Sequence, residues 1–294
     1  MTVPANFDRR SAEILASPNF RSARNIMCDG YMALFEYDAT LNKILAEHSR
    51  YAIIMFAICL AALQRDEDPA SWLTLGRLQD VVGQFKIASP GRVEALVARL
   101  IDIGWMEKRA APSDGRKRIL VPTQPLLNHD MGMIRAQARA CLLVGQGEAL
   151  ERAANCDAEF ERANAIVNVA AFVEAMTMTM KHTEMLQYFL TRDSGYMVLL
   201  SLVLSAQRSP SGTISTIPYQ EISRRFGISR AHVHNVVNDA CDAELLRVLT
   251  PGRTEVELLP RLYELFDKLT ADSLNTVERR FNEALTFLRE NKAA

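Results

Sequence analysis

The sequence has few cysteines, and none has the spacing of a metal site. The five cysteines, Cys28, Cys59, Cys141, Cys156 and Cys241, stand far apart and form no CxxC pair. An odd, scattered set of thiols is typical of a reducing cytosol rather than of a disulfide-stabilised secreted protein. We therefore expect a cytoplasmic protein without a zinc site.

Catalytic motifs are lacking as well. The sequence contains no glycine-rich phosphate loop, no GxSxG elbow and no HExxH helix. The tripeptide Gly145-Gln146-Gly147 lacks the preceding strand and the third glycine of a dinucleotide site. We therefore expect no enzyme activity and no cofactor.

Long hydrophobic runs are also missing. The longest, residues 51–63, falls short of the roughly 20 residues that a membrane-spanning helix needs. Residues 1–10 lack the basic and then apolar order of a signal peptide. The 294 residues, 49% apolar and 23% charged, instead suit a soluble protein of about two domains, with no membrane partner.

Hydrophobic periodicity predicts three helices and a hairpin between residues 51 and 121. Apolar spacing predicts helices over 51–64 and 73–82, and a third helix that Ser89 caps, with Pro90 in its first turn and Gly104 at its end. Residues 105–109 and 118–121 read as two strands around a turn-rich tip. This order of elements is that of a winged helix-turn-helix.

The same order recurs later in the chain. Residues 196–207, 219–226 and 230–244 are predicted helices, and residues 245–259 form a second hairpin. Three landmarks repeat in order, since Tyr51, Ser89 and Pro125 match Tyr196, Ser229 and Pro260. We interpret this as an internal repeat.

The predicted fold is mainly α, with two winged helix-turn-helix units, each with a small β-hairpin wing, joined by long helices. The expected domains are N-terminal helices with the first winged helix (1–125), a helical linker or dimerisation region (126–195), a second winged helix (196–260) and a C-terminal helix (261–294). The methionines Met176, Met178, Met180 and Met185 in the linker are expected to fill a core.

Four features stand out in residues 73–123. They are Ser89 with Val93, the run Ile103-Gly104-Trp105-Met106-Glu107-Lys108-Arg109, the wing Pro112-Ser113-Asp114-Gly115-Arg116, and Thr123 at the wing's end. With these residues, the first winged helix resembles the multiple-antibiotic-resistance-regulator (MarR) family. The resemblance implies that Arg116 enters the minor groove of DNA and that Asp114 helps to hold it. Pro90-Gly91 departs from the family's polar pair, and Glu94 lies on the face that would meet DNA.

The second winged helix resembles helix-turn-helix regulators more broadly, including the catabolite-activator type, over residues 226–237. There, Arg230 can pair with guanine and Asn235 with adenine in the major groove, and a capping serine can reach a phosphate. His232 and His234 are two positions apart and do not share a helix face, so we expect no metal site.

The local charge differs between the two winged helices. Residues 74–125 carry nine basic and five acidic residues, whereas residues 213–261 carry six of each. The first therefore suits phosphate binding better, and the second either reads bases more weakly or contacts protein. The candidate DNA-binding residues are Ser89, Arg92, Arg116, Lys117, Arg118, Ser229, Arg230, His234, Asn235, Asn238 and Arg253.

These patterns favour a sequence-specific double-stranded DNA-binding transcriptional regulator. One chain then acts as a pseudo-dimer on two unlike half-sites about one helical turn apart, or forms a homodimer with four winged helices. The alternatives are a tandem winged-helix replication initiator and a chromosome-partition scaffold that binds protein partners. The apolar helical middle has room for a small-molecule effector, but no residue marks one.

Overall fold

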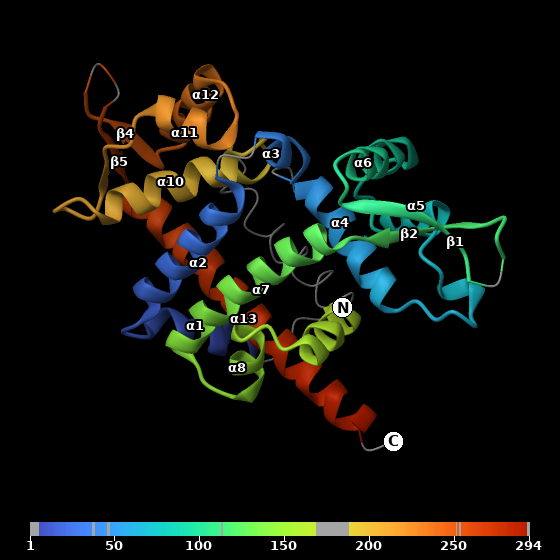
Figure 1. Ribbon diagram of the computed structural model, residues 1–294. Coiled ribbons are helices and arrows are strands. Elements are labelled where there is room, and N and C mark those ends of the chain that lie inside the picture. The colour runs from blue at the N-terminus through green and yellow to red at the C-terminus, as the bar shows by residue number, and fades with distance from the viewer. Residues whose placement is uncertain are drawn as a thin grey trace. The chain divides into compact units, whose positions relative to one another are not determined.

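The computed structural model describes residues 6–36, 39–45, 48–112, 114–168, 188–250, 252 and 254–292. Helices dominate this part of the chain, together with a two-stranded and a three-stranded antiparallel sheet (Figure 1). The prediction of a mainly α fold is therefore confirmed. Among the described helices, none combines the length and the hydrophobicity that crossing a bilayer requires. The four methionines predicted to fill a core lie outside the described residues.

The chain divides into two compact units, each made of separate stretches of sequence. The larger unit consists of Met1–His48, Ala136–Gln146 and Glu174–Glu278. The smaller unit consists of Ser49–Arg135, Gly147–Val173 and Arg279–Ala294. The two segments with matching element order fall in different units, residues 49–122 in the smaller one (the first segment) and residues 195–258 in the larger one (the second segment). The four-part division inferred from the sequence stays a prediction.

The first segment contains four helices and a hairpin, close to the predicted bounds. In chain order they are α4 (His48–Ala62), the 3-10 helix η1 (Pro69–Ser71), α5 (Leu75–Gln84), α6 (Pro90–Asp102), β1 (Met106–Ala110) and β2 (Arg118–Pro122). Thr74 starts α5, because its side-chain oxygen accepts a hydrogen bond from the Arg77 amide at 3.2 Å. Gly104, at φ +74°, ends the α6 region in a backbone conformation that glycine adopts without strain.

Burial follows the predicted apolar faces of the first segment. Val93, Leu96, Val97 and Leu100 of α6 are buried. Under the hairpin, Trp72 is 1% exposed and packs in a cluster with Ala111 and Ile119. The strands pair from Met106 with Pro122 to Ala110 with Arg118.

The second segment has the same order of elements in the larger unit. They are α10 (Gly195–Gln207), β3 (Ile214–Ser215), α11 (Tyr219–Phe226), α12 (Arg230–Asp242), β4 (Leu246–Val248) and β5 (Val256–Leu258). The sheet order is β3-β5-β4, so the first, two-residue strand pairs with the last one. The sequence did not predict β3, because two residues are too few to show an alternating pattern.

The same backbone hydrogen bonds hold both segments. The Leu120 amide donates to the Leu73 carbonyl at 2.7 Å, and the Leu258 amide donates to the Thr213 carbonyl at 2.8 Å. In each segment, the last strand is therefore bonded to the stretch that precedes the second helix. Leu73 in the first segment therefore corresponds to Thr213, the residue just before β3, in the second.

The remaining helices belong to the surroundings of these segments. They include α1 (Phe7–Ala16), α2 (Phe20–Phe35), α3 (Ala39–Leu45), α7 (Gln124–Val144), α8 (Glu148–Ala154) and α13 (Pro260–Lys292), and residues 158–168 are also helical. In the larger unit, the guanidinium of Arg24 in α2 is buried and forms an ion pair with Asp267 of α13. The Asn275 amide of α13 donates to the Phe7 carbonyl of α1 at 2.9 Å. These buried polar contacts fix α1 and α2 against α13.

Candidate nucleic-acid interface

Helix α6 presents its first turn to solvent. Pro90, Gly91 and Arg92 are exposed, whereas Val93 behind them is fully buried. Ser89 is the N-cap and is exposed, and its side chain makes no capping hydrogen bond. Pro90 has no amide hydrogen, and the Arg92 and Val93 amides donate to the Ser89 carbonyl at 3.0 and 3.1 Å. The exposed polar groups at this helix start are therefore the Ser89 hydroxyl and the Arg92 side chain.

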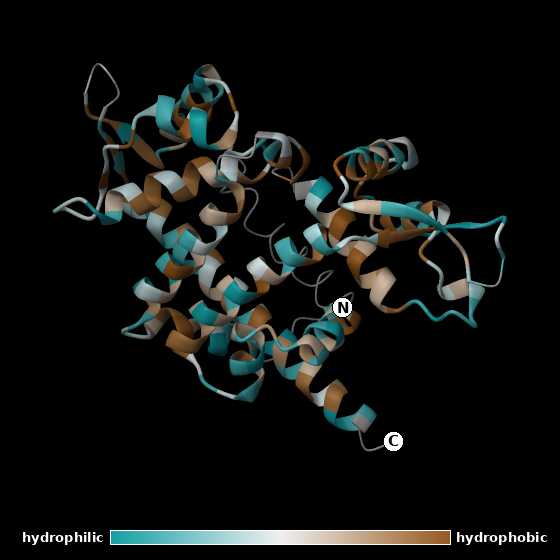
Figure 2. Cartoon of the chain, viewed as in Figure 1, coloured by the Kyte–Doolittle hydropathy of each residue, from teal (hydrophilic) through white to brown (hydrophobic). Residues whose placement is uncertain are grey.

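The tip of the β1–β2 hairpin is an exposed basic turn. The side chains of Arg116, Lys117 and Arg118 are all exposed, and hydrophilic residues line this end of the hairpin (Figure 2). The Asp114 carboxylate accepts a hydrogen bond from the Arg116 amide at 3.0 Å, and the Asp114 carbonyl accepts one from the Lys117 amide, also at 3.0 Å. Asp114 thus orders the backbone that carries these cations.

Trp72 supports the same turn from below. The Lys117 ammonium lies 5.8 Å from the centre of the Trp72 ring, within the range of a cation–π contact. The Lys117 carbonyl also accepts a hydrogen bond from the Ala111 amide at 3.0 Å. The turn therefore presents its charges from an ordered base, which lowers the entropy lost when they bind a partner.

Two other cations of the first segment differ in their availability. Lys108 of β1 is exposed and makes no ion pair with any residue that the structure describes. The sequence singled out only the wing tip of this hairpin. Lys108 is two residues from the buried Met106, so strand alternation places it on the inward face, and only the structure shows that residues 108–110 are all exposed. Arg109 forms an ion pair with Glu107, so part of its charge is neutralised within the strand.

In the second segment, the start of α12 is also exposed. The Ser229 side chain accepts a hydrogen bond from the His232 amide at 3.0 Å, which makes it a capping serine, unlike Ser89. Arg230 and Asn235 are exposed on this helix. Both side chains are of the kind that can hydrogen-bond to base edges, so these two candidates stay predictions.

The other two candidates on α12 are partly buried and bound to each other. The ring of His234 lies 2.9 Å from the Asn238 amide nitrogen and is edge-on to Tyr219, at 6.5 Å between ring centres. The contact occupies Nδ1 of His234 and Nδ2 of Asn238, so these two atoms would have to separate before either could bind DNA. Arg253, the candidate on the second hairpin, lies outside the described residues.

The stretch before α10 holds one side of α12, a feature that the sequence did not predict. The His232 ring is hydrogen-bonded to the Asp193 carbonyl at 2.8 Å, and Arg192 forms an ion pair with Asp239. His232 thus has a structural partner. Among the described residues, no group of three or more His, Cys, Asp or Glu side chains is arranged to hold a metal ion.

Comparison with known proteins identifies no relative of this chain. No protein-family model matches the sequence, and no curated protein and no solved structure shows significant similarity. The likeness to MarR-type regulators therefore stays a prediction from the residues quoted for it.

Proposed function

We propose that this chain binds double-stranded DNA through two winged helix-turn-helix units and thereby regulates transcription. The observation that carries the proposal is the pairing of an exposed helix start with a basic hairpin in residues 89–118. In the second segment, β3 lies between the first two helices and pairs with the last strand, and in the first segment the Leu73 backbone is bonded to the last strand in the same way. Two helices and a hairpin then follow in each segment, an order that supports the assignment of a wing to each.

The residues of the first segment suit two roles in DNA binding. Arg116, Lys117 and Arg118 would contact phosphates or the minor groove, since they are exposed and lie on an ordered turn. Helix α6 would enter the major groove with Arg92 near its start, while the Ser89 hydroxyl reaches a phosphate. Glu94, exposed on the same helix, would disfavour a phosphate there and can accept a hydrogen bond from cytosine.

The test is DNA binding with a wing variant. Genomic fragments captured by the full chain supply the duplex, and a salt-titrated gel shift measures affinity for it. The double variant Arg116→Ala, Lys117→Ala should weaken binding to all sequences, and the slope of log K against log salt should flatten by about 2, because two phosphate contacts are lost.

A matched variant separates this effect from a general loss of charge. The double change Arg139→Ala, Arg162→Ala removes two exposed arginines outside both segments. It should leave the slope unchanged. Equal slopes of log K against log salt for the wild type and the wing variant would show that Arg116 and Lys117 do not contact DNA.

A protein-binding scaffold is the second candidate, and the second segment favours it. Residues 213–261 have no net charge, and His234 and Asn238 are engaged with each other. Genome-wide binding separates the candidates: a few promoter sites support a regulator, one cluster of repeated sites supports a replication initiator, and no retention of DNA supports a scaffold.

A further inference from the structure

The turn between α5 and α6 contains a residue in an unfavourable backbone conformation. Lys86 has φ +53°, in the left-handed region where a residue with a side chain is strained and glycine is not. Its amide donates to the Gly83 carbonyl at 3.0 Å, and the Ile87 amide donates to the Val82 carbonyl at 3.2 Å. These two hydrogen bonds form the Schellman motif that ends α5, and Lys86 occupies the position where glycine is most common.

The corresponding turn of the second segment has glycine at this position. The first turn contains Phe85-Lys86-Ile87, and the second contains Phe226-Gly227-Ile228, in which Gly227 has φ +65°. Each turn ends the helix that precedes a candidate recognition helix. One turn therefore has an unstrained glycine and the other a strained lysine, which indicates that the lysine side chain does more than end a helix.

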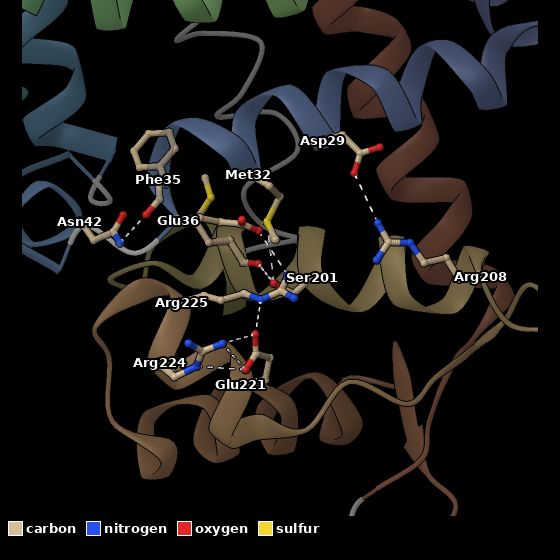
Figure 3. A network of polar contacts seen from close by, with 11 residues as sticks. Asp29, Met32, Phe35, Glu36, Asn42, Ser201, Arg208, Glu221, Arg224 and Arg225 are labelled. Carbon is tan, nitrogen blue, oxygen red and sulfur yellow. Dashed lines mark hydrogen bonds and ion pairs between the residues drawn. The ribbon is translucent and has the colours of Figure 1, made fainter.

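The Lys86 ammonium is available to a partner, unlike the cations at the end of α11. Lys86 is exposed and forms no ion pair with any residue that the structure describes. In the second segment, Arg224 and Arg225 both form ion pairs with Glu221, at 2.9 and 2.8 Å. Arg225 is also paired with Glu36, at 3.2 Å (Figure 3). The charges at the end of α11 are therefore neutralised, whereas the charge of Lys86 is not.

The backbone that carries Lys86 is held on both sides of the turn. The Phe85 ring stacks on that of the buried Phe56 in α4, with 5.3 Å between ring centres and 10° between the planes. The Gln79 side-chain amide of α5 donates to the Pro90 carbonyl in the first turn of α6 at 3.1 Å. The turn and the start of α6 therefore keep a fixed relative position, so binding by Lys86 costs little backbone entropy.

We propose that Lys86 binds a DNA phosphate at the edge of the major groove that α6 enters, a contact that rests on the proposed function. Lys86 precedes Ser89 by three residues, which span at most about 11 Å, and the major groove of B-DNA is about 12 Å wide. When the first turn of α6 lies in the groove, the ammonium therefore reaches the phosphates that border it. Glycine at this position would relieve the strain but would lose the contact.

The substitution Lys86→Gly in the full chain should change stability and DNA binding in opposite directions. It should raise the midpoint of thermal melting by about 2 °C, because glycine relieves the left-handed strain. In a salt-titrated gel shift with captured genomic fragments, it should weaken binding to all sequences about threefold to tenfold and flatten the slope of log K against log salt by about 1. A folding defect cannot mimic this combination, since a misfolded variant melts at a lower temperature.

Three further variants separate the charge of Lys86 from the strain of its backbone. Lys86→Arg returns a cation to the turn and should restore the wild-type slope of log K against log salt. Arg139→Ala removes one exposed arginine of α7, outside both segments, and should leave that slope unchanged. Gly227→Lys makes the opposite exchange in the second turn and should lower the melting midpoint, because it introduces the strain that Lys86→Gly removes.

The outcomes distinguish a failure of this contact from a failure of the proposed function. If the chain binds DNA and Lys86→Gly leaves the slope of log K against log salt unchanged, the contact is overturned while the proposed function stands. A lower melting midpoint in Lys86→Gly overturns the argument from strain on which the proposal stands. If the chain retains no DNA at all, the proposed function and the contact both fail.

Discussion

At the scale of single residues, the surroundings of Asp130 in α7 alter its acidity. Burial raises the pKa of its carboxyl to about 6; Arg280 opposes this shift, and the nearby Glu161 adds to it. An unfolded chain has a carboxyl pKa of about 3.9. Between about pH 4 and pH 6, the folded chain therefore keeps a proton that the unfolded chain has released. Raising the pH through this window lowers the free energy of unfolding.

The change Asp130→Asn should remove this pH-dependent decrease in the free energy of unfolding. At pH 7.5 the variant should be more stable than the wild type by about 1–3 kcal/mol, since one pKa unit corresponds to about 1.36 kcal/mol. At pH 4.5 the difference should be smaller, because the folded wild type is then mostly protonated. Urea denaturation at both pH values measures it. Asp102→Asn, at an exposed position of α6, controls for the loss of one charge, and a variant less stable than the wild type at pH 7.5 would contradict the argument.

At the scale of elements, the two candidate recognition helices begin in different ways. Ser89 and Ser229 have nearly equal backbone angles, φ −72° and −73°, yet only Ser229 accepts a hydrogen bond from its helix. The His232 amide is that donor, and α6 places Pro90 in its first turn. The Ser229 hydroxyl therefore stabilises the start of α12, whereas the Ser89 hydroxyl does not cap α6 and can bind another partner.

This difference predicts opposite outcomes for the same substitution. Ser229→Ala should lower the free energy of unfolding by about 1 kcal/mol, because it leaves a helix amide without its cap. Ser89→Ala should change stability by much less and should instead weaken DNA binding, since the hydroxyl can contact a phosphate. Urea denaturation and gel shifts on both variants check this. An equal loss of stability in both would mean that Ser89 also caps its helix in solution.

The sequence predicted the elements more closely than the contacts between them. The strands predicted over 105–109 and 118–121 were found at Met106–Ala110 and Arg118–Pro122. The helix predicted over 73–82 begins two residues later, at Leu75, because Thr74 is its cap. The same holds for the candidate site. The exposure of Arg116 and Arg230 follows from their turn and cap positions, whereas the contact between His232 and the Asp193 carbonyl joins groups 39 residues apart and has no local signal.

At the scale of the whole molecule, DNA binding cannot come from the total charge. The formal net charge is −1, while residues 74–125 carry an excess of four positive charges. Attraction to phosphate should therefore be concentrated in the first segment. The second segment, with no net charge, should contribute to base choice rather than to general affinity.

The two segments should therefore respond differently to substitution. The double variant Arg230→Ala, Asn235→Ala should weaken binding to a captured site about 10- to 100-fold and should lower the ratio of this affinity to the affinity for unrelated DNA. The slope of log K against log salt should change by at most about 1. The control Arg9→Ala, Asn291→Ala removes the same residue types outside both segments. Competition gel shifts give both quantities. A slope change as large as that of the wing variant would contradict this division of roles.

The sequence by itself determined the helices and hairpins of the two segments, the Ser229 cap and the basic wing tip, because periodicity, turn residues and caps act over a few neighbouring residues. Only the tertiary structure decided that Leu73 and Thr213 are bonded to the last strand of their segments, that Arg24 is buried against Asp267, and that Glu36 of α2 is paired with Arg225 of α11. These features depend on groups far apart in the chain. Their meeting is set by how the helices pack, which no local pattern of residues records.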